Sequence, residues 1–463
     1  MTLNRGYRDA YARVPRRSPR RPAVSSAHGV AVETTPVPGL LVVRTPVHED
    51  SRGWFKESWQ REKMVAAGLP DFGPVQHNVA HNGAAGVTRG IHAEPWDKLV
   101  TVASGSVHGA WVDLREGPTF GTTYELRVDP SVAVYVPRGV ANSYQTLEDA
   151  TVYSYLVNAH WSPDAAYANV NLLDETLGIH WPLPVVEISD KDRGHPRLRD
   201  VVPVPPRRTL VLGAHGQLGR ALSAALPDAI AMSRDDFDLA DPAAYERVDW
   251  NDVDTIINAA AYTAVDLAET PDGRRGAWAV NVTAVAALAR IAIRHGLTLV
   301  TVSSDYVFDG ETEDHPVDEP VSPLGVYGAT KAAGEAVTST VPRHYVVRTS
   351  WVVGEGRNFV STMQDLARRG ISPDVVDDQL GRLTTADELA DGILTLLRTG
   401  APYGIHHVTG GGPARSWADI AREVFVAEGR DPADVRGVST TEYAAGKALA
   451  PRPRHSSLAR TDR

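Results

Sequence analysis

The chain has 463 residues, of which 43% are hydrophobic and 22% are charged, and its formal net charge is −10. These values are typical of globular proteins, so they exclude general disorder, a collagen-like repeat and a coiled-coil rod, while the acidic balance argues against nucleic acid as a partner. The absence of cysteine excludes disulfides, thiolate nucleophiles and cysteine-ligated metal sites.

The first residues form a basic segment. Seven arginines precede residue 22, and no apolar run follows them as the core of a secretory signal would. No stretch approaches the roughly 18 uninterrupted apolar residues that a membrane-spanning helix requires. We therefore expect residues 1–30 to be a disordered tail, and the protein to be cytoplasmic with no membrane partner.

The next part of the chain, residues 31–200, has the pattern of an all-β domain. Short runs rich in Val, Tyr and Thr are separated by Gly and Pro turns, which predicts many short strands in a sandwich or barrel. One helix is expected at residues 59–67. The predicted strands cover residues 40–43, 99–103, 107–114, 124–128, 133–136 and 151–157.

A proline-rich stretch at residues 201–208 predicts a stiff spacer, and the pattern changes after it. In residues 209–463 apolar strands alternate with helices, which indicates parallel βαβ units in a doubly wound α/β sheet. We expect two domains on either side of the spacer. The predicted strands are 209–212, 229–232, 255–258, 298–302 and 345–348, and the predicted helices are 220–226, 277–294 and 332–338.

A glycine-rich turn connects the first strand of the second domain to its first helix. Glycines at such a turn let backbone N–H groups approach a pyrophosphate at the positive end of the helix. The second strand ends at Ser233 and Arg234, where NAD-preferring sites carry a carboxylate, and these side chains suit a 2′-phosphate. We predict NADPH as the preferred cofactor, with NADH as the alternative. The turn contributes Gly213, Gly216, Gln217, Leu218 and Gly219.

A tyrosine and a lysine lie four residues apart in a predicted helix of the same domain. This spacing places Tyr327 and Lys331 on one face, where an ammonium favours the phenolate and brings the pKa of the phenol toward the working range. Ser304 adds a hydroxyl at a strand end. In isolation a Tyr–Lys pair would indicate only a solvated helix face, but together with the glycine turn it predicts a nicotinamide-dependent oxidoreductase.

The first domain contains candidate acid–base residues. Arg89 and His92 share one segment, Lys98 follows, and Asp192 comes near the end of the domain. A histidine oriented by a carboxylate is a competent base, and a lysine can stabilise an enolate; the alternative is a structural histidine. A second alternative is a metal site formed by His77, His81, His92 and Glu94, but we expect no metal.

The second domain, residues 209–463, resembles dTDP-4-dehydrorhamnose reductases of the extended short-chain dehydrogenase family. The matching segments are 213–219, 257–266, 304–310, 327–331, 348–352 and 450–454. The resemblance implies a Rossmann-type fold in which Tyr327 gives a proton to the ketone oxygen and Ser304 hydrogen-bonds that oxygen. Lys331 is implied to tune the pKa of Tyr327 and to bind the nicotinamide ribose. The resemblance further implies that Asp305 and Trp351 face the sugar, and that the cofactor is lined by Asp238, Leu239, Ala259, Ala260, Ala261 and Tyr262.

Residues 35–200 resemble dTDP-4-dehydrorhamnose 3,5-epimerases, which have a cupin-like jelly roll. The matching segments are 51–57, 76–78, 89–92, 98–100, 118–121, 177–182 and 189–192. The resemblance implies that His92 is the base, Asp192 orients it, and Tyr155, or alternatively Tyr153, is the acid. It also implies a homodimer formed through the jelly roll. The implied substrate-binding residues are Arg52, Glu57, Gln76, Asn78, Arg89, Lys98 and Asn142.

Two positions depart from the epimerase pattern: Asn142 replaces a histidine, and Glu94 replaces a glutamine. We predict a bifunctional enzyme that epimerises a dTDP-linked 4-keto-6-deoxyhexose at C3 and C5 and then reduces its C4 ketone to give dTDP-L-rhamnose. The departures leave open a 3-only or 5-only epimerase fused to a 4-ketoreductase that makes another deoxysugar. A non-catalytic regulatory protein that binds nucleotide sugar or NADP is disfavoured by the Tyr327–Lys331 pair.

Overall fold

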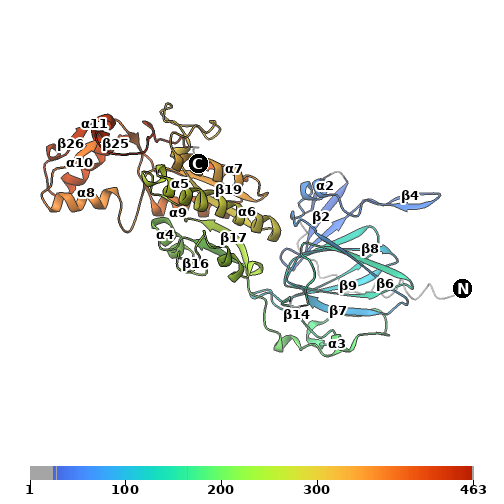
Figure 1. Cartoon of the computed structure of the whole chain (residues 1–463). Helices are drawn as coiled ribbons and strands as arrows, with labels where there is room; N and C mark the ends of the chain where they lie inside the picture. The colour runs from blue at the N-terminus through green and yellow to red at the C-terminus, as the bar shows by residue number, and fades with distance from the viewer. Residues whose placement is uncertain (1–23, 28, 164, 461–463) are drawn as a thin grey trace. The chain divides into compact units, whose positions relative to one another are not determined.

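The computed structural model describes residues 24–27, 29–163 and 165–460. The chain divides into two compact units, Met1–Pro206 and Arg207–Arg463, and the division falls inside the predicted spacer (Figure 1). Part of that spacer belongs to the first unit: Val201 is buried, and the Val204 N–H donates to the Leu114 carbonyl at 2.7 Å. The free spacer is therefore shorter than expected.

The first unit contains two antiparallel sheets (Figure 1). Between them pack buried side chains from both sheets, among them Val100 and Val134 of one and Trp111 and Val140 of the other. The seven-stranded sheet has the order β1 (Val24–Ala27), β2 (Val30–Thr34), β3 (Leu41–Arg44), β11 (Val132–Val136), β8 (Lys98–Ser104), β13 (Thr151–Val157) and β6 (Gln76–Asn82). The five-stranded sheet has the order β10 (Thr123–Val128), β9 (Val107–Asp113), β12 (Val140–Thr146), β7 (Thr88–Ala93) and β14 (Ala168–Asn169).

The predicted strands of this unit are confirmed, and the predicted helix appears as α2 (Arg61–Ala66). Strands β6, β7 and β12 were missed because their His, Asn and Gly residues obscure the alternation on which strand prediction depends. The predicted extent of the disordered tail was also wrong, since residues 24–27 pair with β2. Residues 1–23 lie outside the described part of the chain.

A small hairpin of β4 (His48–Asp50) and β5 (Gly53–Phe55) extends away from the two sheets (Figure 1). Two short helical segments, α3 (Asp190–Arg193) and η2 (Leu198–Asp200), come near the end of the unit. The N–H of Asp192 bonds to the hydroxyl of Ser189, which caps α3 and fixes where Asp192 lies.

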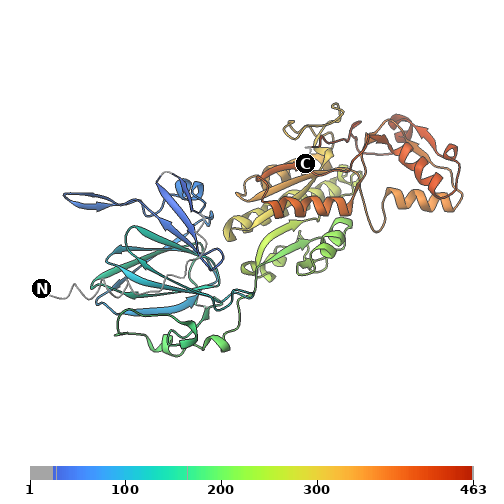
Figure 2. The same ribbon diagram turned by 180° about the vertical axis from the view of Figure 1, so that it is seen from behind.

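The second unit is built on a six-stranded parallel sheet covered by helices on both faces, as the opposite views of Figures 1 and 2 show. Successive residues of β15 point to opposite faces: Leu210 and Leu212 pack with α6, and Val211 packs with α4 and α9. The sheet order is β16 (Ile230–Met232), β15 (Arg208–Leu212), β17 (Val253–Asn258), β18 (Thr298–Ser304), β19 (His344–Thr349) and β24 (Gly404–His407). The main helices are α4 (Gln217–Ala225), α5 (Pro271–Trp278), η6 (Ala279–Thr283), α6 (Ala284–His295), α7 (Val326–Thr338) and α9 (Ala386–Thr399).

The predicted βαβ alternation is confirmed, and the structure adds β24, which was not predicted. The continuous helical stretch Pro271–His295 is long and apolar enough to cross a membrane by length and composition alone. Its Leu288 and Ala292 instead pack in the core against the sheet. A smaller part has its own core and contains α8 (Phe359–Arg368), β21 (Asp374–Val376), β22 (Leu380–Gly381), β25 (Arg415–Ser416), α10 (Trp417–Ala427), β26 (Arg436–Val438) and α11 (Thr440–Ala444).

Candidate active sites

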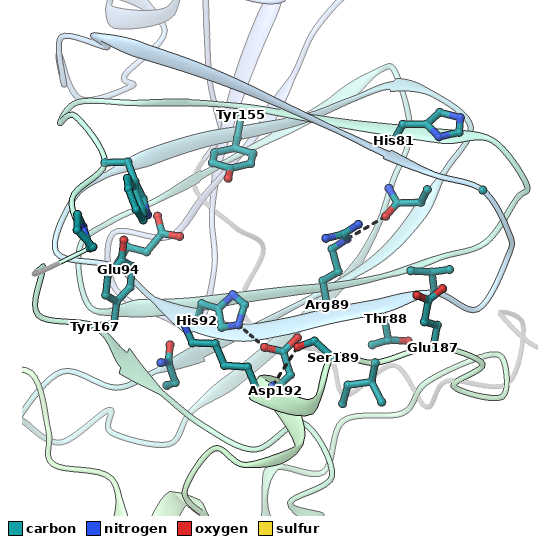
Figure 3. Close-up of a pocket in the computed structure, with 18 residues that line it drawn as sticks. His81, Thr88, Arg89, His92, Glu94, Tyr155, Tyr167, Glu187, Ser189 and Asp192 are labelled. Atoms are coloured by element: carbon teal, nitrogen blue, oxygen red, sulfur yellow. Dashed lines mark hydrogen bonds and ion pairs between the residues drawn. The ribbon is translucent and has the colours of Figure 1, made fainter.

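The first unit has a cavity of about 770 Å³ that is lined by four of the predicted residues: Arg89, His92, Tyr155 and Asp192 (Figure 3). They come from strands β7 and β13 and from helix α3, which are distant in sequence. The lining also includes residues that the sequence did not single out for this role: His81, Asn82, Glu94, Trp161, Tyr167, Asn169, Glu187, Ser189 and Lys191. Trp161 and Tyr167 lie in the segment after β13, where no periodicity or spacing signals a site.

His92 and Asp192 form a hydrogen-bonded pair at the edge of this cavity. The Nε2 atom of His92 is 2.7 Å from Oδ1 of Asp192, across 100 residues of sequence. Burial raises the pKa of Asp192, but the hydrogen bond from His92 and the charge of that imidazole more than offset this, so the pKa lies below its usual value. The carboxylate accepts a hydrogen bond from the Nε2–H group of His92, which leaves the lone pair of the ring on Nδ1. A general base requires this arrangement.

Tyr155 faces His92 from the opposite side of the cavity (Figure 3). Burial, and then the nearby Glu94 carboxylate, raise the pKa of Tyr155 to about 12, so the phenol keeps its proton at neutral pH. Tyr153 is buried in the core instead, where its ring stacks on Tyr144 and its hydroxyl donates to Asn142 Oδ1 at 3.1 Å. The structure therefore places Tyr155 on the cavity and Tyr153 away from it.

Several predicted substrate contacts are not at this cavity. Asn142 is buried on β12 opposite His92 of β7, accepts from the Tyr153 hydroxyl, and is not among the residues that line the cavity. Lys98 is also buried, with its ammonium 2.9 Å from Glu94 Oε1 and over the ring of Tyr155. Glu94 lines the cavity and Lys98 does not, so a direct contact between Lys98 and an enolate is not supported.

The remaining predicted contacts of the first unit are on the edge strand β6 or near the hairpin. Gln76 and Asn78 bond to each other at 2.9 Å on β6 and are not among the lining residues. Glu57 is exposed and pairs with Lys63. Arg52 lies on the hairpin with 88% of its side chain exposed and pairs with Asp50. Within one chain, these four residues do not join the cavity.

The glycine turn of the second unit has the geometry that close approach of a backbone requires. Gly213 has φ +85°, a conformation that favours glycine. A Cβ at Gly219 would lie 2.1 Å from the Gly213 carbonyl oxygen, so no larger residue fits. Gly216 begins helix α4, and its carbonyl accepts from Arg220 N–H as the first bond of that helix. The turn therefore leaves the start of α4, with Gln217 and Leu218, open to an anionic group.

Strand β16 ends at the predicted cofactor-selecting pair. The Ser233 hydroxyl is buried and donates to Asp236 Oδ2 at 2.7 Å, so it is already used within the chain. Arg234 is 86% exposed and lies 3.6 Å from Asp238. The guanidinium, rather than the hydroxyl, is the group available to a phosphate.

The other predicted cofactor residues lie at or near strand ends. Ala259, Ala260, Ala261 and Tyr262 follow β17 at the carboxyl edge of the sheet. The N–H of Tyr262 donates to Asn281 Oδ1 at 2.9 Å, which fixes this segment against the π-helical turn η6. We expected Leu239 to line the cofactor, but its side chain is buried in the core and is not available to one.

Tyr327, Lys331 and Ser304 come together where α7 meets the end of β18. The Lys331 ammonium donates to the Val302 carbonyl at 2.6 Å, and burial lowers its pKa to about 8. Burial, and then the charge of Asp305, raise the pKa of Tyr327 to about 12, although a hydrogen bond with Ser304 acts in the opposite direction. The expected lowering of this pKa by Lys331 is therefore wrong for this structure, because the ammonium is bonded to Val302 and the phenol is buried.

Asp305 and Trp351 both make contacts within the chain. Asp305 is buried, accepts from the Ser304 hydroxyl at 2.9 Å, and has its pKa raised to about 6 by burial. It therefore holds the Ser304 hydroxyl in place. Trp351 is half-buried and stacks on Trp417, with ring centroids 3.6 Å apart, so one face of its indole is covered.

Comparisons with known proteins agree with both halves of this description. Residues 34–200 match the family model for dTDP-4-dehydrorhamnose 3,5-epimerase, and residues 207–462 match the model for the RmlD substrate binding domain. A Streptococcus pyogenes protein named RmlC homolog is 49% identical over 183 residues, which is 38% of this chain and 92% of that protein.

The second half has equally clear relatives. A Mycobacterium tuberculosis dTDP-4-dehydrorhamnose reductase is 40% identical over 263 residues, which is 54% of this chain and 84% of that protein. The crystal structure of the Bacillus anthracis dTDP-4-dehydrorhamnose reductase in complex with NADP is 33% identical with a TM-score of 0.52, and it covers 55% of this chain and 91% of that one. The chain thus belongs to two families at once, the dTDP-4-dehydrorhamnose 3,5-epimerases through its first unit and the RmlD reductases through its second.

Proposed function

We propose that this chain is a bifunctional enzyme of dTDP-L-rhamnose formation. The first unit inverts C3 and C5 of dTDP-4-dehydro-6-deoxy-D-glucose, and the second reduces the C4 ketone with NADPH. The observation that carries the proposal is that an oriented histidine and a protonated tyrosine face each other across one cavity. The same chain also carries a complete Ser–Tyr–Lys group in a unit that belongs to the reductases.

In the epimerase unit, the C4 ketone of the substrate acidifies the C–H bonds at C3 and C5. His92 removes one of these protons through Nδ1, and Asp192 stabilises the imidazolium that results. Tyr155 then delivers its proton to the opposite face of the same carbon, and this inverts the centre. The guanidinium of Arg89 is held by Asn82 at 3.0 Å and supplies positive charge beside the enolate and the diphosphate.

In the reductase unit, the dinucleotide fits a Rossmann-type site, because Gly219 lets the start of α4 pack closely on the glycine turn and the exposed guanidinium of Arg234 can turn to a 2′-phosphate. NADPH, when bound, supplies the hydride. Tyr327 donates its proton to the C4 oxygen, and a pKa of about 12 keeps that proton in place until charge develops. Ser304 would orient the same oxygen, and Lys331, whose ammonium is bonded to the Val302 carbonyl here, would bind the nicotinamide ribose.

We further propose that the protein is a cytoplasmic homodimer that associates through the jelly roll. Arg52 matches the epimerase pattern but lies on a hairpin that extends from its own unit (Figure 1). The same hairpin exposes Trp54 and Phe55, the latter by 66%. A second copy of the chain would cover these rings and bring Arg52 to a cavity.

One experiment tests the proposed function. The protein is incubated with dTDP-4-keto-6-deoxyglucose and NADPH in deuterated water, and NMR follows deuterium entry at C3 and C5 and reduction at C4. We expect exchange at both carbons and a rhamno-configured product. Exchange at one carbon would identify a single-position epimerase, and neither exchange nor reduction would identify a non-catalytic protein.

Two variants assign the steps to the units. His92→Ala removes the base and should lower exchange by about 10²–10⁴-fold, while it spares ketone reduction when the sugar is supplied already epimerised. Tyr327→Phe should have the reverse effect. If His92→Ala retained wild-type exchange, the assignment of the base would be wrong.

A further inference from the structure

A second imidazole lies beside the His92–Asp192 pair and has no part in the mechanism described above. His195 follows helix α3, and its ring lies 5.3 Å from that of His92 in an edge-to-face arrangement. Its Nε2 atom is 4.0 Å from Asp192 Oδ1. One ligating atom from each of His92, Asp192 and His195 lies within 4.8 Å of the other two.

The environment of His195 leaves its ring nitrogens unused. The side chain is only 7% exposed, yet neither Nδ1 nor Nε2 has a hydrogen-bond partner among the described residues. A buried polar group with no partner is rare in folded proteins, and a bound ion is one of the groups that satisfy such an atom.

We propose that His92, Asp192 and His195 form a binding site for a divalent transition metal such as Zn²⁺, and that occupancy of this site stops epimerisation. Two imidazoles and one carboxylate are a common protein ligand set for zinc, with bonds of about 2.0–2.2 Å. Oδ1 of Asp192 lies 2.7 Å from Nε2 of His92 and 4.0 Å from Nε2 of His195. Two ligand atoms on one zinc ion are about 3.2–3.6 Å apart, which falls between these distances. Small side-chain movements would therefore bring the three atoms onto one ion.

The consequence for catalysis follows from the identity of the ligands. A metal on His92 and Asp192 replaces the hydrogen bond that orients the base, and a metal-bound imidazole has little remaining basicity. The metal and the catalytic proton therefore compete for the same pair. This second part of the proposal rests on the proposed epimerase function, whereas the binding itself does not.

Metal binding is tested directly on the full-length protein by calorimetric titration with ZnCl₂ and by the visible absorption of bound Co²⁺. We expect the wild type to bind one ion at this site. His195→Phe should lower the affinity for that ion by about 100-fold or more, since even the loss of an outer-shell partner lowers metal affinity by about 10–100-fold. His180→Ala is the matched control, because this histidine of the same unit is 89% exposed and outside the triad. Unchanged zinc affinity in His195→Phe would overturn the proposal, as would equal loss in both variants.

A second variant guards against a folding defect in the first. Asp192→Asn keeps the size of the side chain but weakens it as a metal ligand, so it should also lose the ion. Thermal unfolding of each metal-free variant shows whether the first unit is intact. If both variants are folded and both bind zinc as the wild type does, the triad is not a metal site.

The inhibitory part is tested by the rate of deuterium exchange into the substrate, with each variant measured relative to its own zinc-free rate. Zinc should suppress exchange in the wild type, EDTA should restore it, and His195→Phe should require about 100-fold more zinc. Exchange that continues with zinc bound would overturn the inhibition. An absence of exchange in the zinc-free wild type would refute the proposed function, and the binding titration would still decide the metal site.

Discussion

The two units assemble their acid–base groups in opposite ways. In the second unit, Tyr327 and Lys331 are one helical turn apart, so a short segment brings them together. In the first unit, His92 and Asp192 are 100 residues apart and meet only because α3 packs beside β7. The comparison teaches that a locally built pair is recognisable from spacing, whereas a pair built by tertiary contacts becomes evident only when the fold is known.

The two proton donors nevertheless reach a similar state. The pKa values of Tyr155 and Tyr327 are both raised to about 12, in each case first by burial and then by a nearby carboxylate. The carboxylates are Glu94 in one unit and Asp305 in the other. Both phenols are therefore protonated at neutral pH and suited to donate a proton, although one lies on a strand and the other on a helix.

The largest expected effect separates the cavity tyrosine from its buried neighbour. Tyr155→Phe should lower inversion at C3 and C5 by about 10²–10⁴-fold, because it removes the proton donor on the face opposite His92. Tyr153→Phe leaves the cavity intact and should instead destabilise the first unit by about 1–3 kcal/mol, since buried Asn142 loses its donor. The rate at which NMR detects the inverted product measures the first effect, and urea unfolding measures the second. If Tyr153→Phe lost activity and Tyr155→Phe lost only stability, the placement of the acid would be wrong.

Cofactor binding by the second unit should depend on its glycine turn and be independent of the first unit. Gly219→Ala places a methyl group against the Gly213 carbonyl, so NADPH affinity measured by fluorescence should fall by about 100-fold or more. Deuterium exchange by the first unit should remain, which serves as the internal control. Loss of both activities would show that the units are not independent.

A smaller effect is expected at the cofactor's 2′-phosphate. Arg234→Ala removes one charge-assisted contact and should raise the KM for NADPH about tenfold, because such a contact contributes about 1.5–3 kcal/mol. The KM for NADH should change little, since NADH lacks this phosphate. Equal changes with both cofactors would place Arg234 outside the phosphate site.

The smallest effect concerns stability in acid. Burial raises the pKa of Asp192, but the hydrogen bond from His92 more than offsets this, and the folded-state pKa is below the unfolded value of about 3.9. The ionised carboxylate therefore stabilises the fold above that unfolded value, and this contribution is lost as pH falls through the folded pKa. Asp192→Asn should make unfolding of the first unit less sensitive to pH in this range, as measured by urea melts. An unchanged pH profile would contradict the pairing.

Much of the reductase site could be predicted from sequence, and less of the epimerase cavity. The glycine turn and the Tyr327–Lys331 spacing report local geometry, and both lie where expected. Arg52 and Asn142 match a family pattern, yet one is on an exposed hairpin and the other is in the core. A pattern match identifies a residue type at a position, but it does not state which neighbours the fold provides.

His195 shows the same limit most clearly. Nothing in its sequence context distinguishes it from the other histidines, and its closeness to His92 arises from the packing of the segment after α3. The sequence presented Glu94 as a departure from the family and as a candidate metal ligand, whereas the structure shows its bond to Lys98 and its place on the cavity.

The amino-acid sequence by itself determined the two-unit organisation, the order of β and βαβ segments, and the families to which the units belong, because periodicity and short motifs act over a few residues. The tertiary structure alone decided which tyrosine faces the cavity, that Lys98 is covered by Glu94, and that two histidines share Asp192. These outcomes depend on contacts between segments distant along the chain, and the packing that brings those segments together is set by the fold as a whole.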